Sequence, residues 1–274
     1  MSWRTPMTAI DVAIVNWNTA KAALAAASAY LASEGVEPRV TIVDNASQSG
    51  QRQVLQEGCP PGVRLELREE NLGYGAAANL ALREREAELV CVSNADVLPE
   101  PGALAALAAV ALGEPDAGMV GPVFGGETDR YHARLPGAAA MLGRIFAGSF
   151  ARGAVQPPPP GEVKEAGQPS GACFVLRRTT WERLGGFDEG FFLWYEDVDL
   201  AKRLRNAGFR NLIGGSARVG HAGARSFAQL DPRTQQAIRL DSVERYIRKH
   251  HRPAMPIAAP LLRVSRRLRA GKRG

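Results

Sequence analysis

The first half of the chain alternates between two hydrophobic periodicities, and this alternation limits the fold more than any other sequence feature. Short apolar runs, typical of buried strands, are separated by Ala- and Leu-rich segments, typical of helices. The strand-like runs are Ile10–Val15, Val40–Val43, Val63–Leu67, Leu89–Val92 and Met119–Phe124, and the helix-like segments are Thr19–Ser33, Tyr74–Glu86 and Pro101–Leu112. This order predicts βαβ units, and therefore an α/β fold with a mostly parallel central sheet flanked by helices.

The second half contains one irregular stretch between ordered segments. Residues 125–171 are rich in Gly and Pro and weakly periodic, with a short helix expected near 138–146. The stretch is either a mobile loop, at about 137–170, or a passive linker between two domains. Further helices are expected from near Thr180, over Glu196–Ala207 and over Asp231–His250.

The net charge of +6 belongs to the end of the chain. The last fourteen residues contain no acid and six bases, namely Arg263, Arg266, Arg267, Arg269, Lys272 and Arg273. The rest of the chain is neutral, which argues against nucleic acid as a partner. If Pro260 opens a helix, its apolar residues share one face and its arginines the other. Such a helix suits peripheral contact with an anionic membrane; the alternative is a frayed, solvated terminus. Deleting residues 261–274 is expected to weaken vesicle binding without destroying the fold.

Nothing in the sequence predicts a membrane anchor or a secreted protein. The longest apolar run, Ala103–Leu112, is far shorter than the roughly 20 residues that span a bilayer. The N-terminus lacks the pattern of a signal peptide. The three cysteines, Cys59, Cys91 and Cys173, are too few and too scattered for a disulfide framework. A cytoplasmic protein is therefore expected.

Two polar motifs follow predicted strands, at the sheet edge where open α/β folds bind ligands. Asp44, in TIVDNASQSG, would accept hydrogen bonds from a ribose or a base, or else cap a turn. The segment NLGYGAAAN, Asn71–Asn79, places Gly73 and Gly75 at a helix start, which suits phosphate. It resembles a dinucleotide fingerprint, but Asp44 precedes it where an acid should follow. A nicotinamide enzyme is therefore disfavoured.

Other residues offer groups for metal binding or proton transfer. Asp96 would hold Mg²⁺ or Mn²⁺ while a diphosphate supplies further oxygens, or it would form a turn. Glu196 and Asp197, in YEDVDL, would supply a general base, or only complement the dipole at a helix N-terminus. His221 would join Asp96 as a ligand and favour Mn²⁺, or it would be structural.

Seven motifs, in order and in spacing, resemble glycosyltransferase family 2, and most closely its bacterial rhamnosyltransferase-like branch. They are IVNWN (14–18), VDNAS (43–47), NLGYGAAAN (71–79), SNADVLPEPG (93–102), GACFVLRR (171–178), GGFDEGFFLWYEDVDLAKRLRNAGFR (185–210) and His221. The resemblance implies a GT-A fold over residues 8–225. Residues 8–120 would be a Rossmann-like half that binds the nucleotide-sugar, and 121–225 the acceptor half. Residues 226–274 would be a helical extension that carries the basic tail.

The same resemblance implies an inverting transferase that depends on Mn²⁺ or Mg²⁺. It would move a sugar, such as rhamnose or a related deoxysugar, from a dTDP- or UDP-linked donor to a hydroxyl of a glycan, glycolipid or small molecule. The implied donor residues are Asn16, Asn18, Asp44, Asn71, Gly73, Tyr74, Asn79, Asn94 and Asp96; the catalytic residues are Asp197, as the base, and Glu196; the acceptor residues are Trp194 and Tyr195; and the metal ligands are Asp96 and His221.

Two places depart from the family pattern. The first acid of the D-x-D motif is Asn94, as in many rhamnosyl-like members, and residues 166–170, AGQPS, stand where relatives tend to have an Asp-Trp-like pair. Two alternative functions stay open. A sugar-nucleotide nucleotidyltransferase is disfavoured because no Gly-rich loop follows the first strand. A non-catalytic nucleotide-sugar-binding protein is disfavoured because Asp96, Asp197 and His221 are intact.

Overall fold

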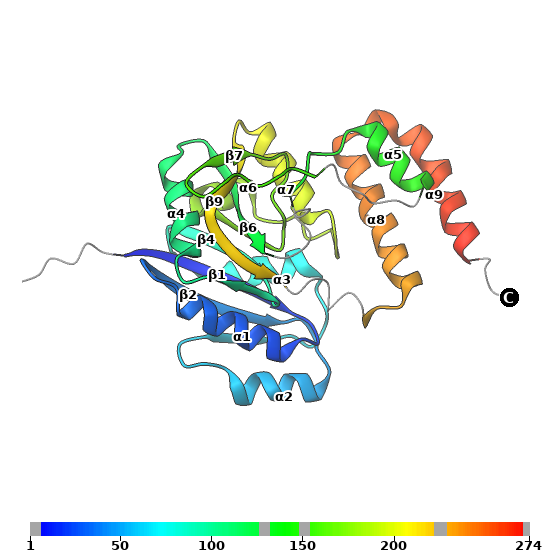
Figure 1. The fold of residues 1–274 in the computed structure, drawn as a ribbon. Coiled ribbons are helices and arrows are strands. Elements are labelled where there is room, and N and C mark those ends of the chain that lie inside the picture. The colour runs from blue at the N-terminus through cyan, green and yellow to red at the C-terminus, as the bar shows by residue number, and fades with distance from the viewer. Residues whose placement is uncertain (1–6, 126–131, 148–153, 222–228, 271–274) are drawn as a thin grey trace, which may run out of the picture.

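The computed structural model describes residues 7–125, 132–147, 154–221 and 229–270, which form an α/β fold around one sheet (Figure 1). The strands are β1 (Thr8–Asn16), β2 (Val36–Asp44), β3 (Arg64–Leu67), β4 (Leu89–Asn94), β5 (Val97–Pro99), β6 (Ala117–Gly125), β7 (Val163–Glu165), β8 (Cys173–Arg177) and β9 (Arg210–His221). The helices are α1 (Ala20–Leu31), α2 (Ser49–Gly58), α3 (Tyr74–Leu82), α4 (Ala103–Gly113), α5 (Ala138–Ala147), α6 (Arg178–Leu184), α7 (Glu196–Asn206), α8 (Pro232–His250), the short 3₁₀ helix η2 (Arg252–Ala254) and α9 (Met255–Ala270).

The sheet follows the order β3-β2-β1-β4-β8-β6-β9-β5, with β7 beside β9. Strands β1 to β4 pair in parallel, as do β6 and β9. The antiparallel strand β8 joins these two parallel parts, because it pairs with β4 on one side and β6 on the other. The predicted mostly parallel α/β sheet is confirmed.

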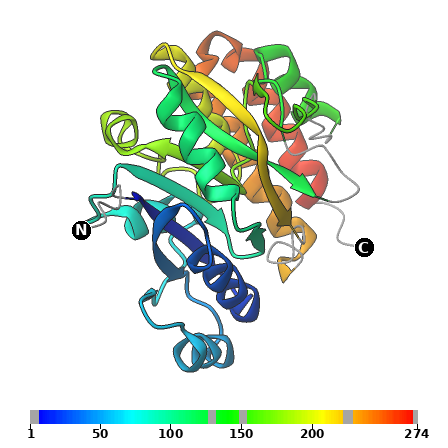
Figure 2. The same cartoon turned by 60° about the vertical axis from the view of Figure 1, so that its left-hand side comes forward.

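The alternation of side chains in β1 explains why helices cover both faces of the sheet. Ile10, Val12 and Ile14 pack into one buried cluster, with α1 and α4. Ala13 and Val15 point the other way, into a cluster with α3, α6 and α7. A strand that is apolar on both faces needs a helical layer on each. Figure 2 shows the strands of the sheet seen from another side, with helices around them.

Most predicted elements are confirmed, but their ends and one helix differ. The helix expected over Tyr74–Glu86 ends at Leu82. Helix α2 was not expected, because its sequence contains only two large apolar residues, Val54 and Leu55, and only Leu55 is buried. Pro260 does not open a helix, because α9 begins five residues earlier and contains it.

A separate layer consists of α5, α8 and α9, which we call the C-terminal helical unit. Met141 and Ile145 of α5 pack with Val243 and Tyr246 of α8 and with Leu262 of α9. In Figure 1 these three helices lie together at one side of the sheet. The stretch 137–170 therefore contributes an ordered helix, α5, and the strand β7; its residues 148–153 lie outside the described part.

The two predicted domain boundaries can be compared with the elements of the structure. The boundary at 120/121 falls inside β6, so both halves share one sheet. The boundary at 225/226 and the basic residues Lys272 and Arg273 lie outside the described residues. Among the helices of the described residues, none combines the length and the apolar character that crossing a membrane requires.

Candidate functional site

Three predicted site residues stand together where parallel strands end. Asn16 ends β1 and lies opposite Asp44, the last residue of β2. Asn94 ends β4, whose register places it opposite Val15. The carboxyl edge of an open α/β sheet is the usual ligand-binding edge, so the sheet itself brings these side chains into one region.

The carboxylate of Asp44 is fully buried and is engaged by its neighbours. Its Oδ1 accepts hydrogen bonds from Asn16 Nδ2 at 2.7 Å and from Ser47 Oγ at 2.5 Å, and its Oδ2 accepts one from the backbone N–H of Ser47 at 3.1 Å. Asp44 therefore orders the turn after β2, as the capping interpretation expects. A contact between Asp44 and the nucleoside stays a prediction.

Asn18 belongs to the same network. Its backbone N–H donates to Ser47 Oγ at 2.7 Å, and its side-chain Oδ1 accepts from the backbone N–H of Gln48 at 2.8 Å. The left-handed φ of Asn18, 55°, suits an asparagine. Sequence reasoning missed Ser47, whose hydroxyl ties the loop after β1 to the loop after β2.

Asn71 and Gly73 form a second network, centred on Asn45. The amide of Asn45 donates to Asn71 Oδ1 at 2.8 Å and to the carbonyl oxygen of Gly73 at 3.1 Å, and its Oδ1 accepts from Leu72 N–H. Gly73 has φ 86°, and a Cβ on it would lie 2.4 Å from the carbonyl oxygen of Phe192. Glycine is therefore required where the start of α3 meets the segment before α7.

Tyr74 and Asn79 hold that segment against α3. The backbone N–H of Tyr74 donates to Phe192 O at 2.9 Å, and its hydroxyl donates to Gly171 O at 3.0 Å. Burial raises the pKa of the Tyr74 phenol well above its ordinary value, and the nearby Glu196 adds to the rise. The amide of Asn79 bonds the backbone of Phe187 in both directions. Donor contacts by Tyr74 and Asn79 stay predictions.

Asp197, the predicted base, lies in the first turn of α7 and is only 6% exposed. Its Oδ2 accepts hydrogen bonds from Gln168 Nε2 at 2.5 Å and from the backbone N–H of Gly171 at 3.1 Å. A Cβ at Gly171 would lie 2.6 Å from the Cβ of Asp197, so this approach also depends on glycine. Sequence reasoning missed Gln168; its one signal was the departure from the family pattern at 166–170.

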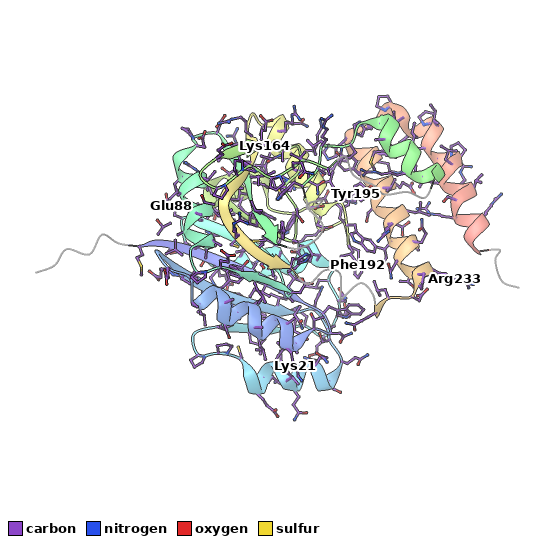
Figure 3. The ribbon with its side chains drawn as sticks, in the orientation of Figure 1. Lys21, Glu88, Lys164, Phe192, Tyr195 and Arg233 are labelled. Atoms are coloured by element: carbon purple, nitrogen blue, oxygen red, sulfur yellow. The ribbon has the colours of Figure 1, made fainter. Side chains whose placement is uncertain are left out.

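The two aromatic residues before α7 have strained backbones. Trp194 and Tyr195 are both left-handed, with φ of 63° and 72°. Consecutive left-handed bulky residues are uncommon and are often found at functional sites. The guanidinium of Arg239 lies 4.3 Å from the Trp194 ring, and the Tyr195 hydroxyl accepts a hydrogen bond from Arg144. Figure 3 shows Tyr195 between the sheet and the C-terminal helical unit.

Asp96 and His221 meet across two paired strands. Asp96 precedes β5, His221 ends β9, and the register pairs Val97 with His221. The distance from Asp96 Oδ1 to His221 Nε2 is 3.2 Å, and both side chains are mostly buried. One carboxylate and one imidazole fit Mn²⁺ better than Mg²⁺. Within the described residues no group of three such side chains could hold a metal alone, so the two would need ligands from a substrate or water.

The predicted base and the predicted metal ligands are connected through backbone hydrogen bonds. Gly171 N–H binds Asp197, and the next residue, Ala172, accepts a hydrogen bond from the N–H of Asn94 at 2.8 Å. Asp96 follows Asn94 by two residues. The entry into β8 therefore connects the carboxylate of α7 with the edge that carries Asp96 and His221.

His132 was missed by sequence reasoning and supports the same loop. Its Nε2 lies 2.7 Å from the carbonyl oxygen of Pro122, and its Nδ1 accepts from the backbone N–H of Ser170 at 3.3 Å. These partners require a neutral ring protonated at Nε2. Burial lowers the pKa of His132 to about 4, although the bond to Pro122 opposes the fall.

Comparison with solved structures shows what this architecture is. A mannosyltransferase from Pyrobaculum calidifontis, solved with GDP-Man and Mn²⁺, aligns with 97% of this chain and 76% of its own, at a TM-score of 0.61 and 19% identity. GalNAc-T7 with UDP, GalNAc and Mn²⁺ aligns with 78% of this chain and 44% of its own, at a TM-score of 0.57 and 17% identity. The fold is the GT-A fold of glycosyltransferases.

Sequence comparison gives the family. The family described as "Glycosyltransferase like family 2" matches residues 6–237. An N-acetylglucosaminyl-diphospho-decaprenol L-rhamnosyltransferase of Mycobacterium tuberculosis is 32% identical over 235 residues, which cover 77% of this chain and 75% of the relative. The chain belongs to glycosyltransferase family 2, and is a glycosyltransferase of its rhamnosyltransferase-like branch.

Proposed function

We propose that the protein transfers rhamnose, or a related deoxysugar, from a dTDP- or UDP-linked donor to a hydroxyl of a lipid-linked glycan, with inversion at the anomeric carbon. The observation that carries the proposal is the backbone connection from Asp197, through Gly171 and Ala172, to the edge with Asp96. This connection supports an assignment of Asp197 as a base beside a diphosphate site. The identity to a rhamnosyltransferase whose acceptor is a diphospho-decaprenol glycolipid supports the sugar and acceptor classes.

In the proposed reaction the acceptor hydroxyl oxygen forms a bond to the anomeric carbon as the bond from that carbon to the phosphate oxygen breaks. The hydroxyl proton passes to the Asp197 carboxylate. Gln168 and Gly171 hold this carboxylate by two hydrogen bonds to Oδ2, so it keeps one orientation while the acceptor binds. Trp194 and Tyr195 line the acceptor side, and the bonded pair Asn16 and Asp44 the nucleoside side.

Asp96 and His221 would hold Mn²⁺ or Mg²⁺ in this proposal. A divalent cation there would neutralise the negative charge that grows on the departing diphosphate. An oxygen and a nitrogen donor 3.2 Å apart at a ligand-binding edge suit that purpose. Loss of either donor should weaken nucleotide binding in the presence of metal more than in its absence.

The test of the base is Asp197→Asn, with Glu196→Gln as the neighbouring control. We expect Asp197→Asn to bind the donor like the wild type and to lose transfer by about 10²-fold or more. Glu196→Gln should lose less, because only Asp197 is assigned the proton transfer. If wild type and variants are equally inert with every donor, a non-catalytic binding protein is the better description. Formation of a nucleotide-sugar from a nucleoside triphosphate would instead favour the nucleotidyltransferase.

The nucleobase of the donor can be identified from the melting temperature of the protein, measured with UDP, dTDP, GDP and CDP, each with and without Mn²⁺ or Mg²⁺. A ligand that binds only the folded state raises the melting temperature. A metal-dependent rise with dTDP or UDP alone is expected. A rise with GDP alone would contradict the proposed donor class.

We also propose that the protein works in the cytoplasm, at the inner membrane surface, where a lipid-linked acceptor is found. The outer face of α9 supports this. Ile257 and Val264, seven residues apart on that face, are 59% and 53% exposed. Arg263 and Arg267 are exposed beside them. An apolar row flanked by arginines fits an anionic bilayer surface.

A further inference from the structure

Arg144 of α5 is a buried cation without an acidic partner among the described residues. Its side chain is 7% exposed, and its hydrogen bonds run from one nitrogen, Nη1, to the hydroxyl of Tyr195 at 2.8 Å and to the sulfur of Met141 at 3.8 Å. The guanidinium also lies 5.8 Å from the centre of the Tyr195 ring. Neither partner carries a charge that would balance it.

Another buried arginine shows how this chain otherwise compensates such a charge. Arg178 is 9% exposed, and its Nη2 lies 2.6 Å from the carboxylate of Asp11. Burying an ionised group without a counter-charge is costly, and an unpaired one is therefore rare in a fold. Asp199 of α7 offers no such balance, because Arg203, Lys249 and His250 already surround it.

The surroundings of Arg144 point to an anion that belongs to the substrate. Tyr195, its partner, is the N-cap of α7, and the candidate base Asp197 is the second residue of that helix. A second guanidinium, that of Arg239, stacks on the adjacent Trp194 at 4.3 Å. Two arginines from the C-terminal helical unit thus approach the strained pair Trp194 and Tyr195.

We propose that Arg144 binds a phosphate of the diphosphate that links the acceptor sugar to its lipid. The inference rests on the proposed function, which assigns a lipid-linked acceptor. The donor also carries a diphosphate, but the proposed function places that one beside Asp96 and His221. Arg144 instead belongs to the helical unit whose outer face carries Ile257 and Val264. In the proposed function, a diphosphate between acceptor sugar and lipid lies between the base and the membrane surface. Arg144 suits it because α5 packs in the helical unit that carries this outer face, and its partner Tyr195 caps the helix of Asp197.

The first experiment measures binding without transfer. Farnesyl diphosphate, which has no sugar, is titrated by calorimetry into wild type, Arg144→Lys, Arg144→Met and a remote surface control, Arg39→Met. We expect Arg144→Met to weaken binding about 10- to 100-fold, the range for a lost charge-assisted hydrogen bond. Arg144→Lys should lose less affinity, and Arg39→Met should bind like the wild type. Equal binding by wild type and Arg144→Met would overturn the proposal, whatever sugar the enzyme transfers.

The second experiment separates the acceptor from the donor. Arg144→Met should raise KM for an N-acetylglucosaminyl-diphospho-prenol of short chain, and leave KM unchanged for an alkyl N-acetylglucosaminide, which has no phosphate. A rise in KM for the donor instead would assign Arg144 to the donor diphosphate and overturn the acceptor assignment. If the wild type transfers sugar to neither acceptor, that result counts against the proposed function. The farnesyl diphosphate titration would still test whether Arg144 binds a diphosphate.

Melting temperature distinguishes this role from a structural one. An uncompensated buried charge does not stabilise the free protein, so Arg144→Met should melt at the wild-type temperature or above it. A lower melting temperature, together with equal losses toward both acceptors, would show that Arg144 only supports α5, and would overturn the proposal.

Discussion

The side-chain amide of Gln168 donates a hydrogen bond of 2.5 Å to Oδ2 of Asp197, the carboxylate we propose as the base. Gln168 is itself 1% exposed, and its backbone pairs in both directions with Ala133. The residue that holds the carboxylate is therefore itself fixed by a segment 35 positions earlier in the chain. Gln168 is a positioning residue in this arrangement.

Replacing Gln168 by Leu should lower kcat about tenfold and change the donor KM little, because one charge-assisted hydrogen bond to the carboxylate is lost. Gln168→Glu should be worse at neutral pH and recover as the pH rises, since two adjacent carboxyl groups share a proton. The exposed Gln53→Leu serves as the control. Steady-state kinetics across pH measure both effects; a change in KM alone would speak against positioning.

His132 should make the protein less stable in mild acid. Burial lowers its pKa from 6.5 to about 4 in the folded state. Between those values the unfolded chain binds a proton that the folded chain does not, so the free energy of unfolding falls as the pH drops from 6.5 towards 4. The full effect is about 3 kcal/mol. Urea unfolding at pH 7 and pH 5 should show a smaller difference for His132→Gln. His251→Gln, at a more exposed ring, should change that difference less.

Gly73→Ala should destabilise the protein more than Gly62→Ala. Both glycines have a left-handed φ, 86° and 84°, so alanine strains both backbones by about 1–2 kcal/mol. Only at Gly73 would the new Cβ collide, at 2.4 Å from the carbonyl oxygen of Phe192; Gly62 has nothing within 4 Å. Thermal unfolding of both variants measures the difference. Equal losses of stability in the two variants would mean that the segment before α7 moves away from the added methyl group at little energetic cost.

The outer face of α9 should control vesicle binding. Arg263→Glu with Arg267→Glu should weaken binding to phosphatidylglycerol vesicles at least tenfold at low salt, at about 1 kcal/mol per basic residue. Ile257→Ser with Val264→Ser should weaken it at all salt concentrations, and Lys21→Glu on α1 should have no effect. Sedimentation with vesicles measures this. Point variants are better than deletion of 261–274, because Leu262 is buried in the helical unit. Undiminished sedimentation of both double variants would reject the membrane contact.

The elements could be predicted from sequence wherever burial is periodic. Strand β1 has both faces in apolar clusters, and such a run is visible without a structure. Helix α2 could not be found, since it buries one residue, Leu55. The position of Pro260 within α9 also escaped prediction, because a proline at a helix start and one inside it look alike in sequence.

The candidate site was predictable only for residues that stand in motifs. Asp96, Asp197 and His221 belong to patterns, and the structure brings Asp96 and His221 to 3.2 Å. Gln168, His132 and Arg144 stand in no motif. Each depends on a contact with a residue far along the chain, as Gln168 does on Asp197, 29 positions later, and that information is not local.

Strand β8 has a consequence for how such an enzyme can change its substrates. Gly171 and Ala172, which lead into this strand, bind Asp197 and Asn94 through their main-chain groups, and at position 171 the contact requires glycine. In the proposed mechanism, main-chain contacts therefore set the spacing of the reacting groups, separately from the surfaces that select sugars. Loops around the site can be exchanged between relatives, or recombined in the laboratory, while the spacing between Asp197 and the edge that carries Asp96 is kept.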